Sequence, residues 1–147
     1  MTIQAAYAVA AGLILVFARI SAPHAHTGDG PAVLAGLGVA VVLYLALARG
    51  AERPSRRLVV PAAAGAASEE IVWRWGVLAG TAPLLGWMGA FALSTAAFAG
   101  RHTRTATGAY LLLGGAFGGV FLATGRLAAA IAAHAGYNVL ALLWRRP

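Results

Sequence analysis

The sequence predicts an all-α protein, a polytopic bundle of about six transmembrane helices. Its composition supports this, since 61% of the 147 residues are hydrophobic and only 10% are charged, against roughly 25% charged residues in soluble domains. The mean hydropathy is +0.78. The apolar residues also fall into runs close to the ~20 residues that a helix needs to cross a bilayer. These runs are 3–18, 31–48, 58–80, 84–99, 108–124 and 127–144.

The first run predicts a retained helix rather than a cleaved leader. Run 3–18 has no basic residue before it, and Arg19 closes the apolar stretch instead of opening it. A signal peptide has the opposite arrangement, with the basic residues first. The loop that follows, residues 21–31, contains proline and glycine. It is predicted to connect the first two helices outside the cytoplasm.

The later runs are joined by short links, which make neighbouring helices antiparallel. The sequence "GTAP", residues 80–83, is predicted to join the third and fourth helices, and the region around "TGR", residues 124–126, to join the fifth and sixth. The fifth run contains "GGAFGG", residues 114–119. Glycines four apart share one face of a helix and let helices approach closely in lipid. Two such pairs are predicted to pack, Gly114 with Gly118 and Gly115 with Gly119.

The positive charge of the chain is explained by membrane topology rather than by nucleic-acid binding. The formal net charge is +7, and all 11 basic residues are arginines. Basic residues gather in the cytoplasmic connections of membrane proteins. Most arginines fall on one side of the predicted bundle, so we expect both termini in the cytoplasm. The cytoplasmic set is Arg49, Arg53, Arg56, Arg57, Arg101, Arg104, Arg145 and Arg146, with Arg19 and Arg126 on the other side.

A few polar side chains interrupt the apolar runs, and each ionisable one costs at least ~2.5–3.5 kcal/mol at the centre of a spanning helix. The chain has no cysteine, which excludes thiolate chemistry. The remaining candidates for chemistry lie in three places. They are Glu69, Glu70 and Arg74 in the third run, His102 after the fourth, and His134 and Asn138 in the sixth.

Helix geometry assigns different roles to the two adjacent glutamates. Residues four apart project within about 40° of each other on a helix, so Glu70 is predicted to pair with Arg74. Glu69 points elsewhere and needs a partner on another helix or a water-filled cavity. His134 and Asn138 are also four apart and share one face.

These groups predict a shared hydrolytic site if His102 closes the same cavity. One carboxylate, two imidazoles and an amide are enough to activate a water molecule and stabilise an oxyanion. Each group also has a structural explanation when it is taken alone. The Glu70–Arg74 pair fits a buried ion pair, His102 an interfacial histidine, and His134 with Asn138 hydrogen bonding between helices.

The three motifs together resemble the CAAX protease and bacteriocin-processing (CPBP, or Abi) family of intramembrane proteases, typified by the Ras-converting CAAX endopeptidase. The family pattern is E-E-x-x-x-R, F-x-x-x-H and H-x-x-x-N on successive core helices. This chain has Glu69-Glu70-x-x-x-Arg74, Phe98-x-x-x-His102 and His134-x-x-x-Asn138, in that order. The resemblance covers residues 58–144 of a single membrane domain, 1–147. Family members often have more helices, so this is a short form.

The resemblance implies a glutamate-dependent endopeptidase. It implies that Glu69 is the general base for the attacking water, assisted by His102. It implies that His134 and Asn138 hold the developing oxyanion. No resident cofactor is expected, although the family has also been described as metalloproteases. The only candidate ligands are Glu69, His102 and His134, so a divalent metal such as zinc stays open.

The resemblance gives Glu70 and Arg74 a supporting role within their helix. It implies a membrane-associated protein or peptide as substrate, cut near the membrane surface. Trimming of a bacteriocin leader and processing of C-terminal anchors in protein sorting both fit. The arginine-only, alanine-rich composition is typical of a GC-rich bacterial genome, so we expect the bacterial cytoplasmic (inner) membrane.

Two other functions remain as alternatives. Buried carboxylates and histidines also form proton relays, so a proton-coupled transporter is the first alternative, although no inverted repeat is evident. The second is a non-catalytic scaffold or immunity protein that kept the fold, since motif residues do not guarantee turnover.

Overall fold

The computed structural model describes residue 10 and residues 30–47, 56–102 and 106–144. Every regular element within these ranges is a helix, which confirms the predicted all-α class. The predicted first helix, 3–18, lies outside the described residues, as do most of the loop 21–31 and many of the arginines that predict the topology.

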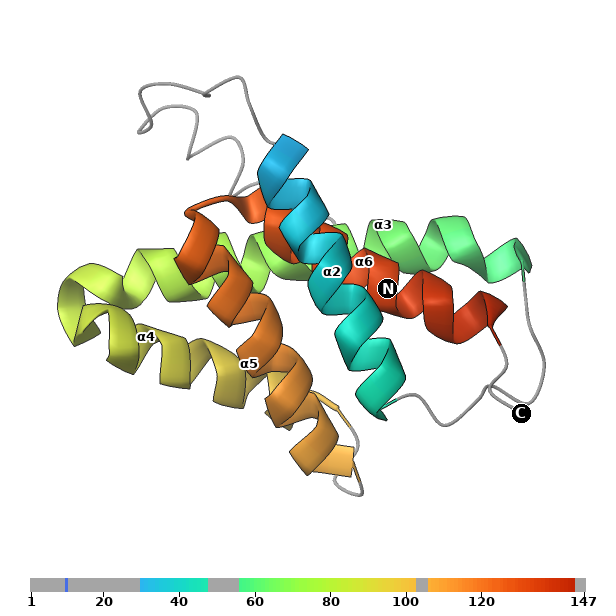
Figure 1. Ribbon diagram of the computed structural model, residues 1–147. Helices are drawn as coiled ribbons and strands as arrows, with labels where there is room; N and C mark the ends of the chain where they lie inside the picture. The colour runs from blue at the N-terminus through green and yellow to red at the C-terminus, as the bar shows by residue number, and fades with distance from the viewer. Residues whose placement is uncertain (1–9, 11–29, 48–55, 103–105, 145–147) are drawn as a thin grey trace.

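Seven helical segments make up the described part of the chain (Figure 1). Three of them begin and end within one residue of the predicted runs 31–48, 108–124 and 127–144. In chain order the segments are α2 (Gly30–Leu47), η1 (Arg56–Leu58), α3 (Val59–Glu70), η2 (Ile71–Ala79), α4 (Gly80–Gly100), α5 (Thr107–Thr124) and α6 (Leu127–Leu143).

The predicted link at residues 80–83 is wrong, because the chain stays helical there. The break falls at Gly86, whose φ of 67° and ψ of 164° are open mainly to glycine. The chain reverses direction in this region (Figure 1). Pro83 lies inside α4, three residues before this break, and the Thr81 hydroxyl donates to the Val77 carbonyl at 2.7 Å.

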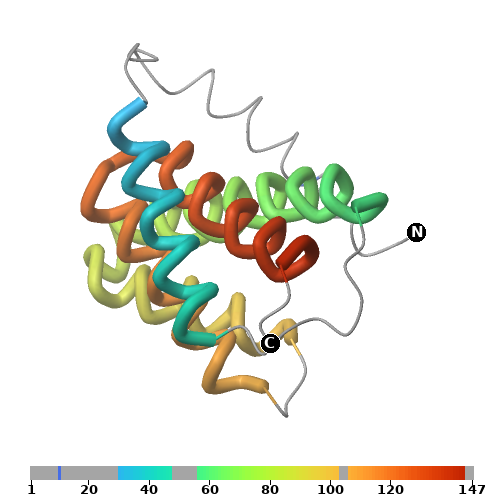
Figure 2. The backbone as a smooth tube through the Cα atoms, turned by 45° about the vertical axis from the view of Figure 1, so that its right-hand side comes forward, coloured from blue at the N-terminus to red at the C-terminus, as the bar shows by residue number. Residues whose placement is uncertain are grey.

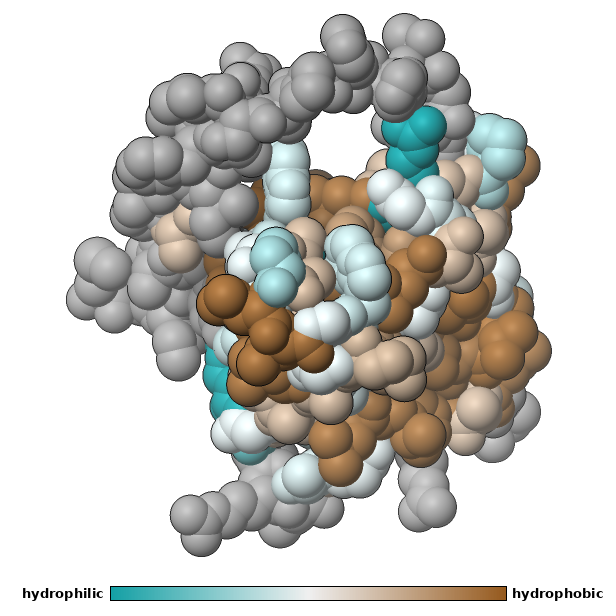
Figure 3. Space-filling model, turned by 90° about the vertical axis from the view of Figure 1, so that its left-hand side faces the viewer, coloured by the Kyte–Doolittle hydropathy of each residue, from teal (hydrophilic) through white to brown (hydrophobic). Residues whose placement is uncertain are grey.

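The helices have the length and surface of a membrane protein. Three stretches are long and apolar enough to cross a bilayer: Gly30–Leu47, Arg56–Gly100 and Thr107–Thr124. Leu127–Leu143 is a shorter apolar helix. The described residues therefore do not establish the predicted count of about six. Apolar side chains cover much of the side seen in Figure 3, and near the reversal Leu84 is 85% exposed, as lipid contact would require.

Helix α6 lies at the centre of the bundle and contacts α2, α3 and α5 (Figure 2). Its inner face consists of alanines, and Ala129, Ala130 and Ala133 are fully buried. Helix α2 approaches this face so closely that a Cβ atom built on Gly36 would lie 2.2 Å from the Ala129 carbonyl oxygen. Small residues on both helices therefore set the position of the helix that carries His134.

Only one of the two predicted glycine faces of α5 makes close contacts. A Cβ at Gly114 would lie 2.8 Å from the Phe98 ring, and a Cβ at Gly118 would lie 2.9 Å from Phe91. A Cβ at Gly115 or Gly119 would meet no described atom within 4 Å. The predicted packing role is thus confirmed for the first pair, which faces α4, whereas the second pair makes no such close contact with any described residue.

We expect Gly36→Ala to destabilise the bundle and Gly38→Ala, its control on the same helix, to leave it intact. The new methyl at Gly36 would collide with backbone rather than with a movable side chain, and overpacking of this kind costs about 1–3 kcal/mol. A methyl at Gly38 meets no described atom within 4 Å and should gain roughly 0.5–1 kcal/mol of helix propensity. Thermal unfolding in detergent checks both, and equal midpoints for the two variants would contradict the described α2–α6 contact.

Candidate active site

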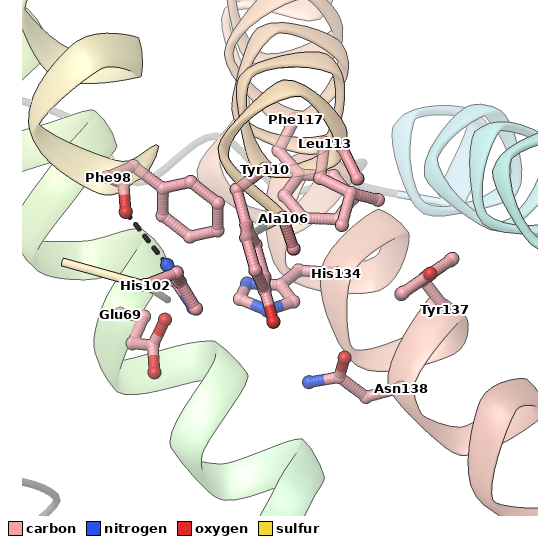
Figure 4. Close-up of a pocket in the computed structure, with 11 residues that line it drawn as sticks. Glu69, Phe98, His102, Ala106, Tyr110, Leu113, Phe117, His134, Tyr137 and Asn138 are labelled. Atoms are coloured by element: carbon pink, nitrogen blue, oxygen red, sulfur yellow. Dashed lines mark hydrogen bonds between the residues drawn. The ribbon is translucent and has the colours of Figure 1, made fainter. Parts of the chain in front are cut away.

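The four side chains predicted to be catalytic line a single cavity of about 280 Å³ (Figure 4). Glu69 comes from the end of α3, His102 from the turn after α4, and His134 and Asn138 from α6. Segments far apart in sequence therefore deliver the motif residues to one place. The full lining is Glu69, Phe98, His102, Ala106, Ala109, Tyr110, Leu113, Phe117, His134, Tyr137 and Asn138.

The predicted pairing of Glu70 with Arg74 is confirmed. Both side chains are fully buried, and the Arg74 Nε donates to Glu70 Oε2 at 2.8 Å. Arg74 also donates through Nη1 to the Ser94 hydroxyl at 3.0 Å, and Ser94 donates to the Trp73 carbonyl at 2.7 Å. The hydrogen bonds of Ser94 with Arg74 and Trp73 thus connect the α3–η2 segment, which contains the ion pair, to α4.

The backbone changes type between the two members of this pair. Glu70 ends the α-helical part, and residues Ile71–Ala79 form a π-helix. Such wider turns are rare and are found frequently at functional sites.

Glu70 has a second partner that helix geometry did not predict. The His134 Nδ1 donates to Glu70 Oε1 at 2.8 Å. The imidazole is stacked on Phe117, with ring centroids 4.6 Å apart, and meets Phe98 edge-on at 5.8 Å. The expectation that Glu70 is neutralised within its own helix is therefore incomplete. One carboxylate holds Arg74 with one oxygen and orients His134 with the other, which leaves Nε2 as the remaining ring nitrogen of His134.

His102 lies just beyond the end of α4 and is held by two contacts. Its Nδ1 donates to the Phe98 carbonyl at 2.8 Å, so Nε2 is the nitrogen left to accept a proton. Its ring is stacked on Tyr110, with centroids 3.8 Å apart. The same Phe98 packs its ring on both histidines. The F-x-x-x-H motif therefore has a structural reason, because Phe98 positions the imidazoles of both His102 and His134.

Glu69 has a partner on another element, as predicted. The partner is Arg101, whose Nη2 donates to Glu69 Oε1. The other carboxylate oxygen, Oε2, is buried and makes no hydrogen bond to any described residue. Arg101 was predicted to act only as a topology determinant, and that assignment was incomplete. Its position directly before His102 is the sequence signal that could have placed it near the site.

Two tyrosines are further cavity residues that the motifs do not contain. Tyr110 and Tyr137 both line the cavity, and Tyr110 covers one face of His102. Tyr137 directly precedes Asn138 on α6. Nothing in their sequence context separates them from the interfacial tyrosines that membrane helices commonly carry.

The ionisable side chains of the site are not arranged as a metal centre. Among the residues that the structure describes, no three His, Cys, Asp or Glu side chains lie close enough together to hold a metal ion. Instead, Glu69 contacts Arg101, and His134 contacts Glu70. The three candidate ligands Glu69, His102 and His134 therefore do not form a ligand set in this arrangement.

Comparisons with known proteins give one match. The chain is similar to the family described as "Type II CAAX prenyl endopeptidase Rce1-like", whose model matches residues 51–140, more than half of the chain. Neither the comparison with curated proteins nor the comparison with solved structures gave a significant match.

We expect Glu70→Ala to destabilise the protein strongly, by about 3–5 kcal/mol, because it leaves the fully buried Arg74 without its carboxylate. Ser68→Ala is the control on the same helix, since its hydroxyl only donates to the Ala64 carbonyl at an exposed position, and we expect a change within ~0.5 kcal/mol. Thermal unfolding in detergent measures both. A Glu70→Ala midpoint equal to that of Ser68→Ala would contradict a stabilising role for the buried ion pair.

Proposed function

This chain belongs to the type II CAAX prenyl endopeptidase Rce1-like family, and from this we propose that it hydrolyses a peptide bond near the membrane surface in a membrane-associated protein or peptide. The observation that carries the proposal is the cavity, in which side chains of all three motifs meet. A carboxylate, two imidazoles and a carboxamide are enough to activate a water molecule and to stabilise the oxyanion of an acyl transfer.

In the proposed reaction, Glu69 takes a proton from a water molecule while the water oxygen attacks the carbonyl carbon of the scissile bond. His102 assists through Nε2, since its Nδ1 is engaged by the Phe98 carbonyl. The tetrahedral intermediate then collapses, the C–N bond breaks, and the proton passes to the leaving amine. The products are a new carboxyl terminus and a new amino terminus.

His134 and Asn138 are proposed to bind the oxyanion of the intermediate. Both line the cavity from the same face of α6. Glu70 supports this role, because its hydrogen bond to Nδ1 fixes the imidazole and directs Nε2 away from Glu70. Since the Nδ1 proton is already donated to Glu70, Nε2 can donate to the oxyanion only when the ring carries a second proton on that nitrogen. Phe98 and Phe117 surround this imidazole, and hydrogen bonds to developing charge are stronger in such a low-dielectric site.

We place the protein in the bacterial cytoplasmic membrane with both termini in the cytoplasm. The arginine distribution supports this orientation. The cavity then lies toward the cytoplasmic side, because Arg101 of the α4–α5 connection contacts Glu69. A peptide segment at that surface is the proposed substrate, either a C-terminal membrane anchor processed during protein sorting or a bacteriocin leader. No resident cofactor is part of the proposal.

We expect Glu69→Ala, His102→Ala and His134→Ala each to abolish cleavage while the protein remains in the membrane, and Asn138→Ala to lower it by roughly 10²–10³-fold, the cost of an oxyanion donor. The measurement is C-terminal peptide profiling of membrane and secreted proteins in cells that express each variant at matched levels, with Ser68→Ala as the active control. Truncated termini that vanish in the Glu69 variant identify the substrate and the cleavage site. Identical profiles for Glu69→Ala and the wild type would contradict the proposed function.

A further inference from the structure

The Glu69 carboxylate lies in a place where a charge needs a partner. Its side chain is 7% exposed, at the end of a helix inside an apolar bundle. A buried carboxyl without an opposite charge becomes neutral rather than remaining charged. The neighbouring carboxylate of Glu70 already engages both Arg74 and His134, so the cation in contact with Glu69 is Arg101.

We propose that Arg101 is a positioning residue for the reaction, because its guanidinium fixes the orientation of the Glu69 carboxylate in the cavity. This inference rests on the proposed role of Glu69 as the general base. A general base must hold its basic atom within hydrogen-bond reach of the proton that it takes from water. A hydrogen bond from a guanidinium to one carboxylate oxygen provides that geometric control.

The hydrogen bond to Arg101 also distinguishes the two oxygens of Glu69. Oε1 accepts from Nη2 of Arg101, and Oε2 makes no hydrogen bond to any described residue. With Oε1 held, the carboxylate cannot rotate freely, and Oε2 is left as the oxygen that can take the proton. The guanidinium therefore selects which carboxylate oxygen acts as the basic atom.

The position of Arg101 couples this role to the second motif. Arg101 follows the last residue of α4 and directly precedes His102, and its backbone N–H donates to the Ala97 carbonyl. The same turn therefore presents the partner of the base and the assisting imidazole from one side of the cavity. A displacement of this turn would move both groups together.

Two variants of Arg101 test the inference, with Arg126→Gln as the control for loss of an arginine at the α5–α6 connection. Infrared difference spectroscopy of the purified protein against its Glu69→Gln variant is the first readout, because it isolates the carboxylate stretching bands of Glu69, whose frequencies report on the hydrogen bonds that the carboxylate accepts. We expect Arg101→Gln to shift these bands and Arg101→Lys to keep them close to their wild-type frequencies. A role limited to tying α4 to α3 would lower the thermal midpoint equally in both variants without separating their bands.

The second readout is the rate at which Glu69-dependent termini appear in membranes. We expect Arg101→Gln to lower this rate by about 10²-fold or more, in line with the contribution of a general base, and Arg101→Lys to recover a substantial part of it. Folding is checked by the elution profile in detergent. Wild-type cleavage by Arg101→Gln, or loss of cleavage without a shift of the Glu69 carboxylate bands, would overturn the inference.

The two readouts separate this inference from the proposed function. If Glu69→Gln cleaves as well as the wild type, the proposed function is wrong, whatever Arg101 does. The infrared bands would still decide whether Arg101 orients the Glu69 carboxylate. If instead cleavage depends on Glu69 and Arg101→Gln shows neither shifted carboxylate bands nor a slower rate, the function stands and the role of Arg101 is refuted.

Discussion

The fold depends on one buried carboxylate, that of Glu70. Its two oxygens bind Arg74 and His134, and Arg74 continues the network to Ser94. Segments α3, η2, α4 and α6 are therefore joined by charge-assisted hydrogen bonds between buried side chains. Both oxygens of Glu70 are paired, whereas Nη2 of Arg74 makes no hydrogen bond to any described residue. Removal of one partner from a buried ion pair leaves the other charge uncompensated, so the network restricts how these helices can pack. The orientation of His134 in the cavity is a direct result of this constraint.

The sequence predicted the helices well where the apolar length alone determines them. Segments α2, α5 and α6 match the apolar runs because polar or glycine-rich stretches limit each run. The reversal between α3 and α4 was misplaced, because composition cannot say which of several glycines takes a positive φ. Gly86 does so, whereas residues 80–83 remain helical. The hydrogen bond from the Thr81 hydroxyl to the Val77 carbonyl also could not be predicted from the pattern of apolar residues.

The site was predictable as a set of residues and only partly as a set of contacts. The Glu70–Arg74 pair follows from a spacing of four on one helix. The Glu70–His134 contact joins residues 64 apart in sequence, and no periodicity specifies it. Arg101 was missed for a different reason. An arginine at the end of a membrane helix is already explained by topology. The sequence sign of its contact with Glu69 is therefore only its position directly before His102.

The arrangement around Glu70 also has a consequence for how the protein enters the membrane during synthesis. Glu70 is synthesised 64 residues before His134. Arg74 follows Glu70 by four residues and is its partner on the same segment, so the two opposite charges can be inserted together as an ion pair. Arg74 can therefore act as the counterion of Glu70 before α6 is in place. When α6 packs against α3, Glu70 gains its second hydrogen bond, from His134.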